Sequence, residues 1–257
     1  MEKSCTMVTT DQIVEGLHAL GIRPGDLLLV HSSLKSFGEV EGGAGAVAEA
    51  LVRAVSPGGT VFVPTFNFSQ VPWDRLAPPS LTGAITEAFR KRSDAERSDH
   101  ATHAVTGVGP IAREILADHD KHHPFGEESP LWRLWKRNAG VLLIGCRHNS
   151  SSMIHVAEEV VGVPYLKRTR TQKIITPHGT HEITLRRPNC SKSFYRIDAP
   201  LRAAGKIVDG TIGPSKLMLM RADDIINVAS EMLRRDPTAL LCDAGTCEAC
   251  DEARTYL

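Results

Sequence analysis

A histidine and a glutamate lie three residues apart in the segment IHVAEEVV, at positions 155 and 158. Helical spacing places His155 and Glu158 on one face, where the carboxylate can orient the imidazole and increase its basicity. Such a pair can accept the proton that an attacking nucleophile loses. His31, at the end of an apolar run, is the alternative for an essential imidazole. A purely structural histidine is the competing interpretation at both positions.

Two further segments are rich in hydrogen-bond donors. The first, HSSLKS from His31 to Ser36, follows the apolar run LLLV and offers hydroxyls, backbone amides and one ammonium group, which together can cradle a phosphate. The second, RSDHATH from Arg97 to His103, offers a guanidinium and two imidazoles that can hold a phosphate or a thioester carbonyl. An ordinary polar loop is the alternative for each segment.

Four cysteines in the second half of the chain suggest a metal site. Cys247 and Cys250 form a C-x-x-C motif, and Cys242 and Cys190 could complete four thiolates for a tetrahedral zinc ion. A closed site of this kind is structural, because no coordination position is left for a substrate. Unligated thiols are the alternative. Cys146 ends a buried apolar strand, so packing is favoured there over an acetyl-carrying nucleophile.

The elements that must position these residues begin with a β-α-β unit. Residues 27–33 predict a buried strand, a helix runs from Gly45 to the stop at 56–59, and a second strand covers 60–65. Such units favour parallel strands whose carboxyl ends meet, which would bring His31 and Thr65 to the same edge.

Later segments extend this pattern. NAGVLLIGC predicts another buried strand, and a helix is expected to begin near Ser151, with Ser150 or Ser151 as its cap. In the first half of the chain we also expect a helix over 11–22, an ordered loop over 69–81, a helix over 83–92 and a helix from about Pro110 to Asp118. In the second half we expect a β-hairpin around His178-Gly179 and mostly helical structure from Asp198 to Arg235.

These elements predict an α/β fold and a single domain over 1–257. The expected architecture is a layered sandwich with a central mixed or parallel sheet covered by helices, plus a small β-hairpin and a helical C-terminal part. We find no internal repeat, low-complexity tract or long linker in the sequence.

Charge and composition exclude several classes of protein. Thirty Lys and Arg balance thirty Asp and Glu, so there is no electrostatic argument for a nucleic-acid or anionic-membrane partner. No apolar run reaches the length of a membrane helix, and no secretory signal is expected at the start. Six cysteines without an export signal predict a reducing, cytoplasmic setting. The sequence contains no nucleophile elbow, HExxH, P-loop or dinucleotide-binding motif.

Six segments in one order carry a family resemblance. They are RPGDLLLVHSSLKSFG at 23–38, SPGGTVFVPTF at 56–66, RSDHATHAV at 97–105, HPFGEESPLWRL at 123–134, GVLLIGC at 140–146 and IHVAEEVVGVPY at 154–165. With these segments the chain resembles the aminoglycoside 3-N-acetyltransferase family, also called the antibiotic N-acetyltransferase family, along nearly its full length.

The resemblance implies an acetyl-CoA-dependent enzyme that acetylates an amine of a 2-deoxystreptamine aminoglycoside and so confers antibiotic resistance. Its fold is unrelated to the common N-acetyltransferase superfamily. Residues matched to cofactor contacts are His31, Ser32, Ser33, Leu34, Ser36, Pro64, Thr65, Arg97, Ser98 and His103. His155 with Glu158 would stand at the acceptor amine, as general base and orienting carboxylate in a direct attack on the thioester. Donors at Ser33 or Thr65 could receive the developing oxyanion.

The charge of the segment that follows the His155–Glu158 pair is unexpected for an enzyme that binds an aminoglycoside. Aminoglycosides are polycations, yet residues 164–194 hold seven basic side chains against Glu182 alone. The basic residues could point outward or bind CoA phosphates, or the enzyme could act on a different amine. Acids that could still contact the substrate are Asp74, Glu127, Glu128 and Glu159. Two other functions are alternatives to the one that the resemblance implies. One is an acyltransferase of the same family that uses a non-aminoglycoside amine, and the other is a non-catalytic CoA-binding protein. The sequence predicts no oligomeric state.

Overall fold

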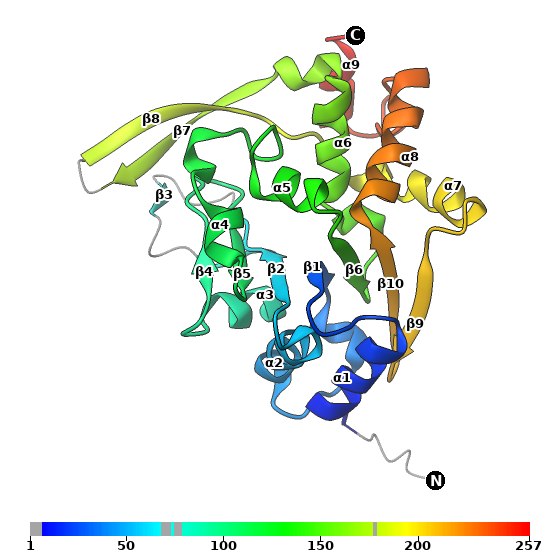
Figure 1. Ribbon diagram of the computed structural model, residues 1–257. Coiled ribbons are helices and arrows are strands. Elements are labelled where there is room, and N and C mark those ends of the chain that lie inside the picture. Colours follow the sequence, from blue (N-terminus) through cyan, green and yellow to red (C-terminus); the bar gives the residue numbers. More distant parts are fainter. Residues whose placement is uncertain (1–6, 68–72, 75–78, 177–178) are drawn as a thin grey trace.

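A seven-stranded mixed sheet forms the centre of the protein in a computed structural model that describes residues 7–67, 73–74, 79–176 and 179–257 (Figure 1). Its strand order is β4-β5-β2-β1-β6-β10-β9. The strands of this sheet are β1 (Leu27–Ser32), β2 (Thr60–Pro64), β4 (Glu96–Arg97), β5 (Val105–Val108), β6 (Gly140–Ile144), β9 (Val208–Ile212) and β10 (Ser215–Arg221). The three central strands β2, β1 and β6 are parallel, and β5 and β10 pair with them in the antiparallel direction. The predicted β-α-β unit and mixed sheet are therefore confirmed.

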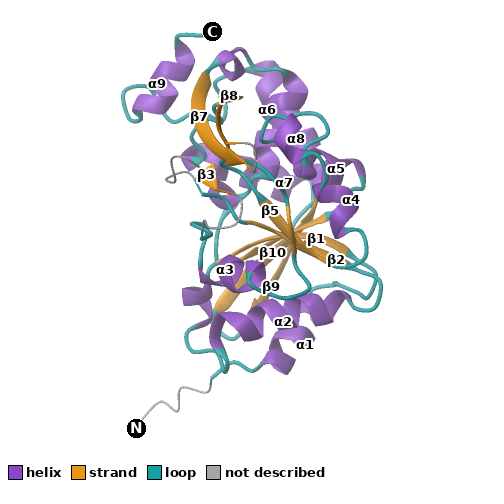
Figure 2. Ribbon diagram, turned by 90° about the vertical axis from the view of Figure 1, so that its left-hand side faces the viewer, coloured by secondary structure: helices purple, strands orange, loops and turns teal. Residues whose placement is uncertain are grey.

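Helices cover both faces of the sheet (Figure 2). They are α1 (Thr10–Ala19), α2 (Gly43–Val55), α3 (Ala84–Arg90), α4 (Ala112–Leu116), α5 (Pro130–Lys136), α6 (Met153–Val161), α7 (Asp198–Ala203), α8 (Ala222–Arg235) and α9 (Glu248–Arg254). Helices α1, α2 and α3 lie on one face, and α5, α6 and α8 on the other. In the described part of the chain, no helix is long and apolar enough to span a membrane.

The alternation of side chains along the central strands creates two hydrophobic cores. Leu28 and Val30 of β1 pack on the side of α1 and α2, whereas Leu29 between them packs on the side of α6 and α8. Leu142 and Leu143 of β6 divide between the two cores in the same way. Burial on both faces explains why these strands read as continuous apolar runs in the sequence.

A three-stranded sheet projects from this body beside the C-terminal helix (Figure 1). It consists of β3 (Trp73–Asp74), β7 (Thr169–Thr176) and β8 (Gly179–Arg186). The pairing of β7 with β8 confirms the predicted hairpin, although His178 lies outside the described residues. The loop expected over 69–81 also lies largely outside them.

The helical prediction for 198–235 is wrong in its middle. Residues 208–221 form the antiparallel pair β9 and β10, joined by a turn at Gly213-Pro214, and β10 adds to the main sheet beside β6. The short apolar run LMLM in β10 has no periodicity that separates a buried strand from a helix, so tertiary pairing decides its structure. The sequence prediction also gave no helix at α5, although Ser129 caps it and proline occupies its first turn.

Candidate active site

The loop after β6 leads directly into α6, which carries the histidine and glutamate. Met153 is the first residue of α6 and Ser152 is its N-cap, without a side-chain capping hydrogen bond. The expected cap at Ser150 or Ser151 is therefore wrong: Ser150 belongs to a short 3-10 turn, and the Ser151 hydroxyl is buried without a partner among the described residues. The compact turn shifts the start of the helix beyond both predicted caps.

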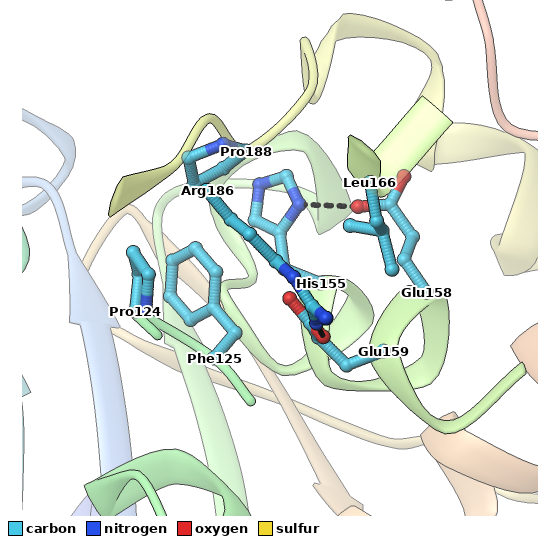
Figure 3. Close-up of a pocket in the computed structure, with 8 residues that line it drawn as sticks. All are labelled: Pro124, Phe125, His155, Glu158, Glu159, Leu166, Arg186 and Pro188. Carbon is cyan, nitrogen blue, oxygen red and sulfur yellow. Dashed lines mark hydrogen bonds and ion pairs between the residues drawn. The ribbon is translucent and has the colours of Figure 1, made fainter. Parts of the chain in front are cut away.

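His155 and Glu158 form a hydrogen-bonded pair in a small pocket (Figure 3). His155 Nδ1 lies 2.7 Å from Glu158 Oε2, and the exposed fractions of the two residues are 9% and 1%. The other ring nitrogen of His155 points away from Glu158 (Figure 3). A carboxylate that binds Nδ1–H leaves Nε2 as the lone-pair nitrogen, which is the arrangement that a general base requires. The residues that line this His155 pocket are Pro124, Phe125, His155, Glu158, Glu159, Leu166, Arg186 and Pro188.

Tyr165 holds the other oxygen of the carboxylate. Its hydroxyl donates a hydrogen bond to Glu158 Oε1 at 2.9 Å, and both side chains are buried. Burial and the adjacent Glu158 carboxylate raise the pKa of Tyr165, so this hydroxyl stays protonated and can donate. No pattern in the sequence predicts a role for Tyr165, although it ends the last segment of the family resemblance.

Two aromatic rings fix the plane of the imidazole. Phe125 stacks on His155 with ring centroids 4.8 Å apart and an interplanar angle of 15°, and Phe194 meets the ring edge-on at 4.8 Å. His103 packs against the edge of Phe125 with centroids 5.0 Å apart. These apolar contacts explain why His155 can rotate little, and sequence spacing alone gives no sign of them.

His31 lies at the end of β1, and its Nε2 faces the backbone amide of Ser152 at 3.4 Å. Burial lowers the pKa of His31 to about 3, so the imidazole is neutral at pH 7 and is a weak proton acceptor. This geometry supports a structural or binding role and argues against His31 as the general base.

The loop after β1 has one hydroxyl without a partner. Ser32 Oγ is buried and makes no hydrogen bond to any described residue. Ser36 Oγ, by contrast, contacts Ser33 O and Ser215 Oγ at 2.7 Å each. Leu34 begins the short 3-10 turn that carries Ser36. The predicted phosphate-binding loop is thus an ordered turn at the carboxyl end of β1.

The predicted residues near β2 make mainly internal hydrogen bonds. Pro64 ends β2, and Thr65 N donates to Ala104 O while Thr65 Oγ1 bonds to Ala104 O and Thr106 Oγ1. Both donors of Thr65 are used within the protein, which argues against Thr65 as the donor to the oxyanion. The backbone amide of Ser33 is also used, in a bond to Ile144 O, so only its hydroxyl is left for that role.

Arg97 and Ser98 also face the protein interior. Arg97 Nη2 donates to Thr65 O at 2.8 Å. Ser98 Oγ accepts from Val105 N and contacts His119 Nδ1, each at 2.8 Å. These contacts tie β4 and its loop to the neighbouring strands.

The predicted substrate acids lie in different places. Glu159 lines the His155 pocket, forms an ion pair with Arg186, and has its pKa raised by burial. Glu127 is exposed, and Glu128 is paired with Arg133 at 3.3 Å. Asp74 lies in β3, paired in register with Ile175 of β7.

Several basic residues of 164–194 form ion pairs with acids of the described chain. Arg168 is buried and lies 3.3 Å from Glu252, and Arg187 pairs with the same carboxylate at 3.0 Å. Lys173 lies 4.0 Å from Glu182. These carboxylates therefore offset part of the positive charge in this segment.

The four cysteines of the predicted metal site come together. Cys190, Cys242, Cys247 and Cys250 have Sγ atoms that all lie within 4.8 Å of one another. Cys146 is separate from them: its thiol contacts His31 O at 3.4 Å, and burial raises its pKa to about 11. A thiol with so high a pKa is a poor nucleophile, which supports the packing interpretation.

The fold is that of an α/β protein with a central mixed sheet, and its site holds a buried histidine–carboxylate pair. The sequence profile of the family described as aminoglycoside 3-N-acetyltransferase matches residues 29–234, so the chain belongs to this family. An aminoglycoside N(3)-acetyltransferase IV from a Salmonella species is 30% identical over 233 residues, which cover 90% of this chain and 89% of the relative. An aminoglycoside N(3)-acetyltransferase III from Serratia marcescens is 30% identical and covers 86% and 95%.

Solved structures agree with this assignment. The crystal structure of the aminoglycoside acetyltransferase AAC(3)-IVa apoenzyme superposes with a TM-score of 0.92 at 29% identity and covers all of both chains. A histidine-to-alanine variant of AAC(3)-IVa was crystallised with apramycin, and this structure gives a TM-score of 0.84 at 28% identity, with 97% of this chain and 100% of the other covered.

Proposed function

We propose that the protein transfers the acetyl group of acetyl-CoA to an amine of a 2-deoxystreptamine aminoglycoside. Family membership supports this activity, as do the structures of an AAC(3)-IVa variant with a gentamicin and with apramycin. The observation that carries the proposal is the His155–Glu158 pair, whose second ring nitrogen is left for the acceptor amine.

His155 acts as the general base in a direct attack. Its Nε2 removes a proton from the amine as the nitrogen bonds to the thioester carbonyl carbon. The carbon–sulfur bond then breaks, and the CoA thiolate leaves and takes the proton from the His155 imidazolium, which restores the neutral base. Glu158 fixes the reactive tautomer and stabilises the imidazolium, while Tyr165 holds Glu158. A positioned base of this kind typically contributes about a hundredfold to ten-thousandfold in rate.

Buried hydroxyls near His31 support a binding site for the cosubstrate. Ser32 Oγ and Ser151 Oγ have no partner among the described residues, and they adjoin the contact between His31 and Ser152. Buried polar atoms in proteins are nearly always hydrogen-bonded, so these two hydroxyls suit the polar atoms of the acetyl-pantetheine arm. The Ser33 hydroxyl is the remaining candidate in this loop for the oxyanion.

The charge distribution favours the aminoglycoside over a different amine. Arg168 and Arg187 share Glu252, which offsets one of their two positive charges and so reduces the repulsion of a polycation. Glu159 supplies a carboxylate on the wall of the His155 pocket, where an incoming ammonium group can compete with Arg186.

Release of free CoA thiol from acetyl-CoA, measured across a panel of amines, tests the proposal. We expect turnover with 2-deoxystreptamine antibiotics and a loss of about a hundredfold or more in kcat for His155→Ala. His181→Ala is the matched control, because His181 is exposed on β8. Glu158→Gln should also lower kcat, because an amide can hold the wrong imidazole tautomer.

Each rival function gives a different result. Turnover with other amines and none with any 2-deoxystreptamine antibiotic would assign the protein to a different acceptor. Binding of CoA without turnover for any amine would indicate a non-catalytic protein. Unchanged kcat in His155→Ala would remove His155 as the base.

A further inference from the structure

The cysteine cluster joins two distant parts of the chain outside the His155 pocket. Cys190 follows β8, Cys242 follows α8, and Cys247 and Cys250 lie at the start of α9. The Sγ atoms of Cys190 and Cys242 are 3.9 Å apart, and all four sulfurs lie within 4.8 Å of one another. Four sulfurs at about 2.3 Å from a tetrahedral zinc ion are separated from one another by about 3.8 Å. The cluster therefore has the size of a tetrathiolate metal site.

Hydrogen-bond donors surround the sulfurs. Lys192 N donates to Cys190 Sγ at 3.4 Å, and Cys242 N donates to Cys250 Sγ at 3.3 Å. Asn189 Nδ2 lies 3.8 Å from the same Cys250 sulfur. Amide donors of this kind orient metal ligands and stabilise thiolate charge.

Positive charge is also held close to the cluster. Arg254 donates to the carbonyl of Cys242, and Arg168 Nη2 donates to Asn189 Oδ1 at 2.8 Å. Four thiolates around one divalent cation carry two net negative charges, and these two guanidiniums, which also pair with Glu252 and Asp251, offset part of that charge. Cys242 and Cys250 are buried, whereas Cys190 and Cys247 are partly exposed.

We propose that Cys190, Cys242, Cys247 and Cys250 bind one zinc ion in a structural site. Four thiolates complete a tetrahedral shell, and thiolate ligands in this geometry favour zinc. The ion takes no part in acetyl transfer, because it has no open position. Its role is to fasten α9 and the segment after α8 to the base of the β7–β8 hairpin.

Hydrogen bonds of Arg168 connect the cysteine cluster to the His155 pocket. Arg168 Nη1 donates to Ala249 O, between two of the cysteines, at 2.9 Å, and its Nε donates to Tyr165 O at 3.2 Å. Tyr165 in turn holds Glu158. Loss of the metal should therefore loosen Tyr165 as well as the C-terminal helix.

Metal content of the purified full-length protein tests the proposal. We expect about one zinc per chain, released when the wild-type protein is denatured in the presence of a chromogenic chelator. Exchange for Co²⁺ should produce the sulfur-to-metal charge-transfer absorption of a tetrahedral thiolate site. Cys247→Ser/Cys250→Ser should lose the zinc and melt at a lower temperature, whereas Cys146→Ser should keep it.

Three results would overturn the proposal. The first is a wild-type protein that carries no zinc and takes up no Co²⁺. The second is a disulfide between Cys190 and Cys242, found by mass spectrometry in protein purified under reducing conditions. The third is equal zinc content in the double variant and the wild type. The wild-type measurements decide the question even where the double variant does not fold, and none of them depends on acetyl transfer.

Discussion

Arg186 forms an ion pair with Glu159 on the wall of the pocket that holds His155 (Figure 3). Glu159 is almost fully buried, whereas Arg186 is partly exposed, with 39% of its side chain accessible. In the function proposed above, a cationic substrate shares Glu159 with Arg186 or displaces it. This one contact would then link the basic segment after α6 to the binding of the substrate.

Arg186→Gln should strengthen the binding of a polycationic acceptor. The variant removes the competitor for Glu159, so we expect KM for the aminoglycoside to fall about two- to fivefold at pH 8, in line with the small value of a partly exposed ion pair. Burial already raises the pKa of Glu159, and removal of Arg186 raises it further, so the gain should disappear toward acid pH as Glu159 is protonated. Steady-state kinetics at pH 6 and pH 8 measure both effects.

Arg187→Gln is the matched control for this prediction. Arg187 pairs with Glu252, away from the His155 pocket, so its loss should leave KM unchanged at both pH values. A KM that rises in Arg186→Gln would show instead that Arg186 itself binds the substrate.

Tyr165→Phe should lower kcat with little change in KM. The variant leaves Glu158 Oε1 buried without its donor, so we expect a loss of about 1.5 to 3 kcal/mol in the free energy of unfolding. Rotation of the freed carboxylate should misplace the tautomer of His155 and lower kcat about three- to thirtyfold. Tyr256→Phe, at an exposed position, should change neither quantity. An unchanged kcat in a stably folded Tyr165→Phe would mean that Glu158 needs no support from Tyr165.

The sequence predicts the parts of this site that depend on local spacing. His155 and Glu158 are three residues apart in one helix, and His31 ends a run that is apolar because both faces of the sheet are covered. The contact between Tyr165 and Glu158 could not be predicted, because the two residues are seven positions apart and Tyr165 lies beyond the left-handed residue Gly162 that ends the helix. Only the path of the chain after Gly162 brings the two together.

Long-range contacts account for the other omissions. The pairing of Glu159 with Arg186 depends on the hairpin lying over α6, which no local pattern encodes. The same holds for β10, whose four apolar residues become a strand because β6 offers an edge to pair with. The cysteine cluster was predictable in part, since the C-x-x-C motif marks it, but the approach of Cys190 depends on the tertiary structure.

Acid should destabilise the protein through four buried histidines. Burial lowers the pKa of His31 and His100 to about 3 and that of His103 and His119 well below the usual value. The unfolded chain binds protons at these residues below about pH 6.5 while the folded protein does not. Their contribution to stability is therefore complete above about pH 6.5 and is lost progressively as pH falls below it, toward about 3 for His31 and His100.

Urea unfolding at pH 7.5 and pH 5 measures this loss. We expect about 1 to 2 kcal/mol of destabilisation at pH 5 for each of His31 and His100. His100→Gln should reduce the difference in the free energy of unfolding between pH 7.5 and pH 5 by the contribution of one buried histidine. His181→Gln, at an exposed site, should leave this difference unchanged. Equal pH dependence in the wild type and His100→Gln would contradict a neutral, buried His100.

Gly145→Ala should weaken the binding of acetyl-CoA in particular. Gly145 has a φ of 61°, and a β-carbon on it would overlap the Ser36 hydroxyl. Ser36 lies in the loop proposed to hold the cosubstrate, where its hydroxyl contacts Ser33 O and Ser215 Oγ. The displaced loop should raise KM for acetyl-CoA about tenfold or more, while KM for the amine changes little. Gly205→Ala is the matched control, because Gly205 has a φ of 66° and open space around its position. This variant has the same backbone strain of about 1 kcal/mol but no overlap with a neighbouring atom. Equal KM values for acetyl-CoA in the two variants would place the cosubstrate away from Ser36.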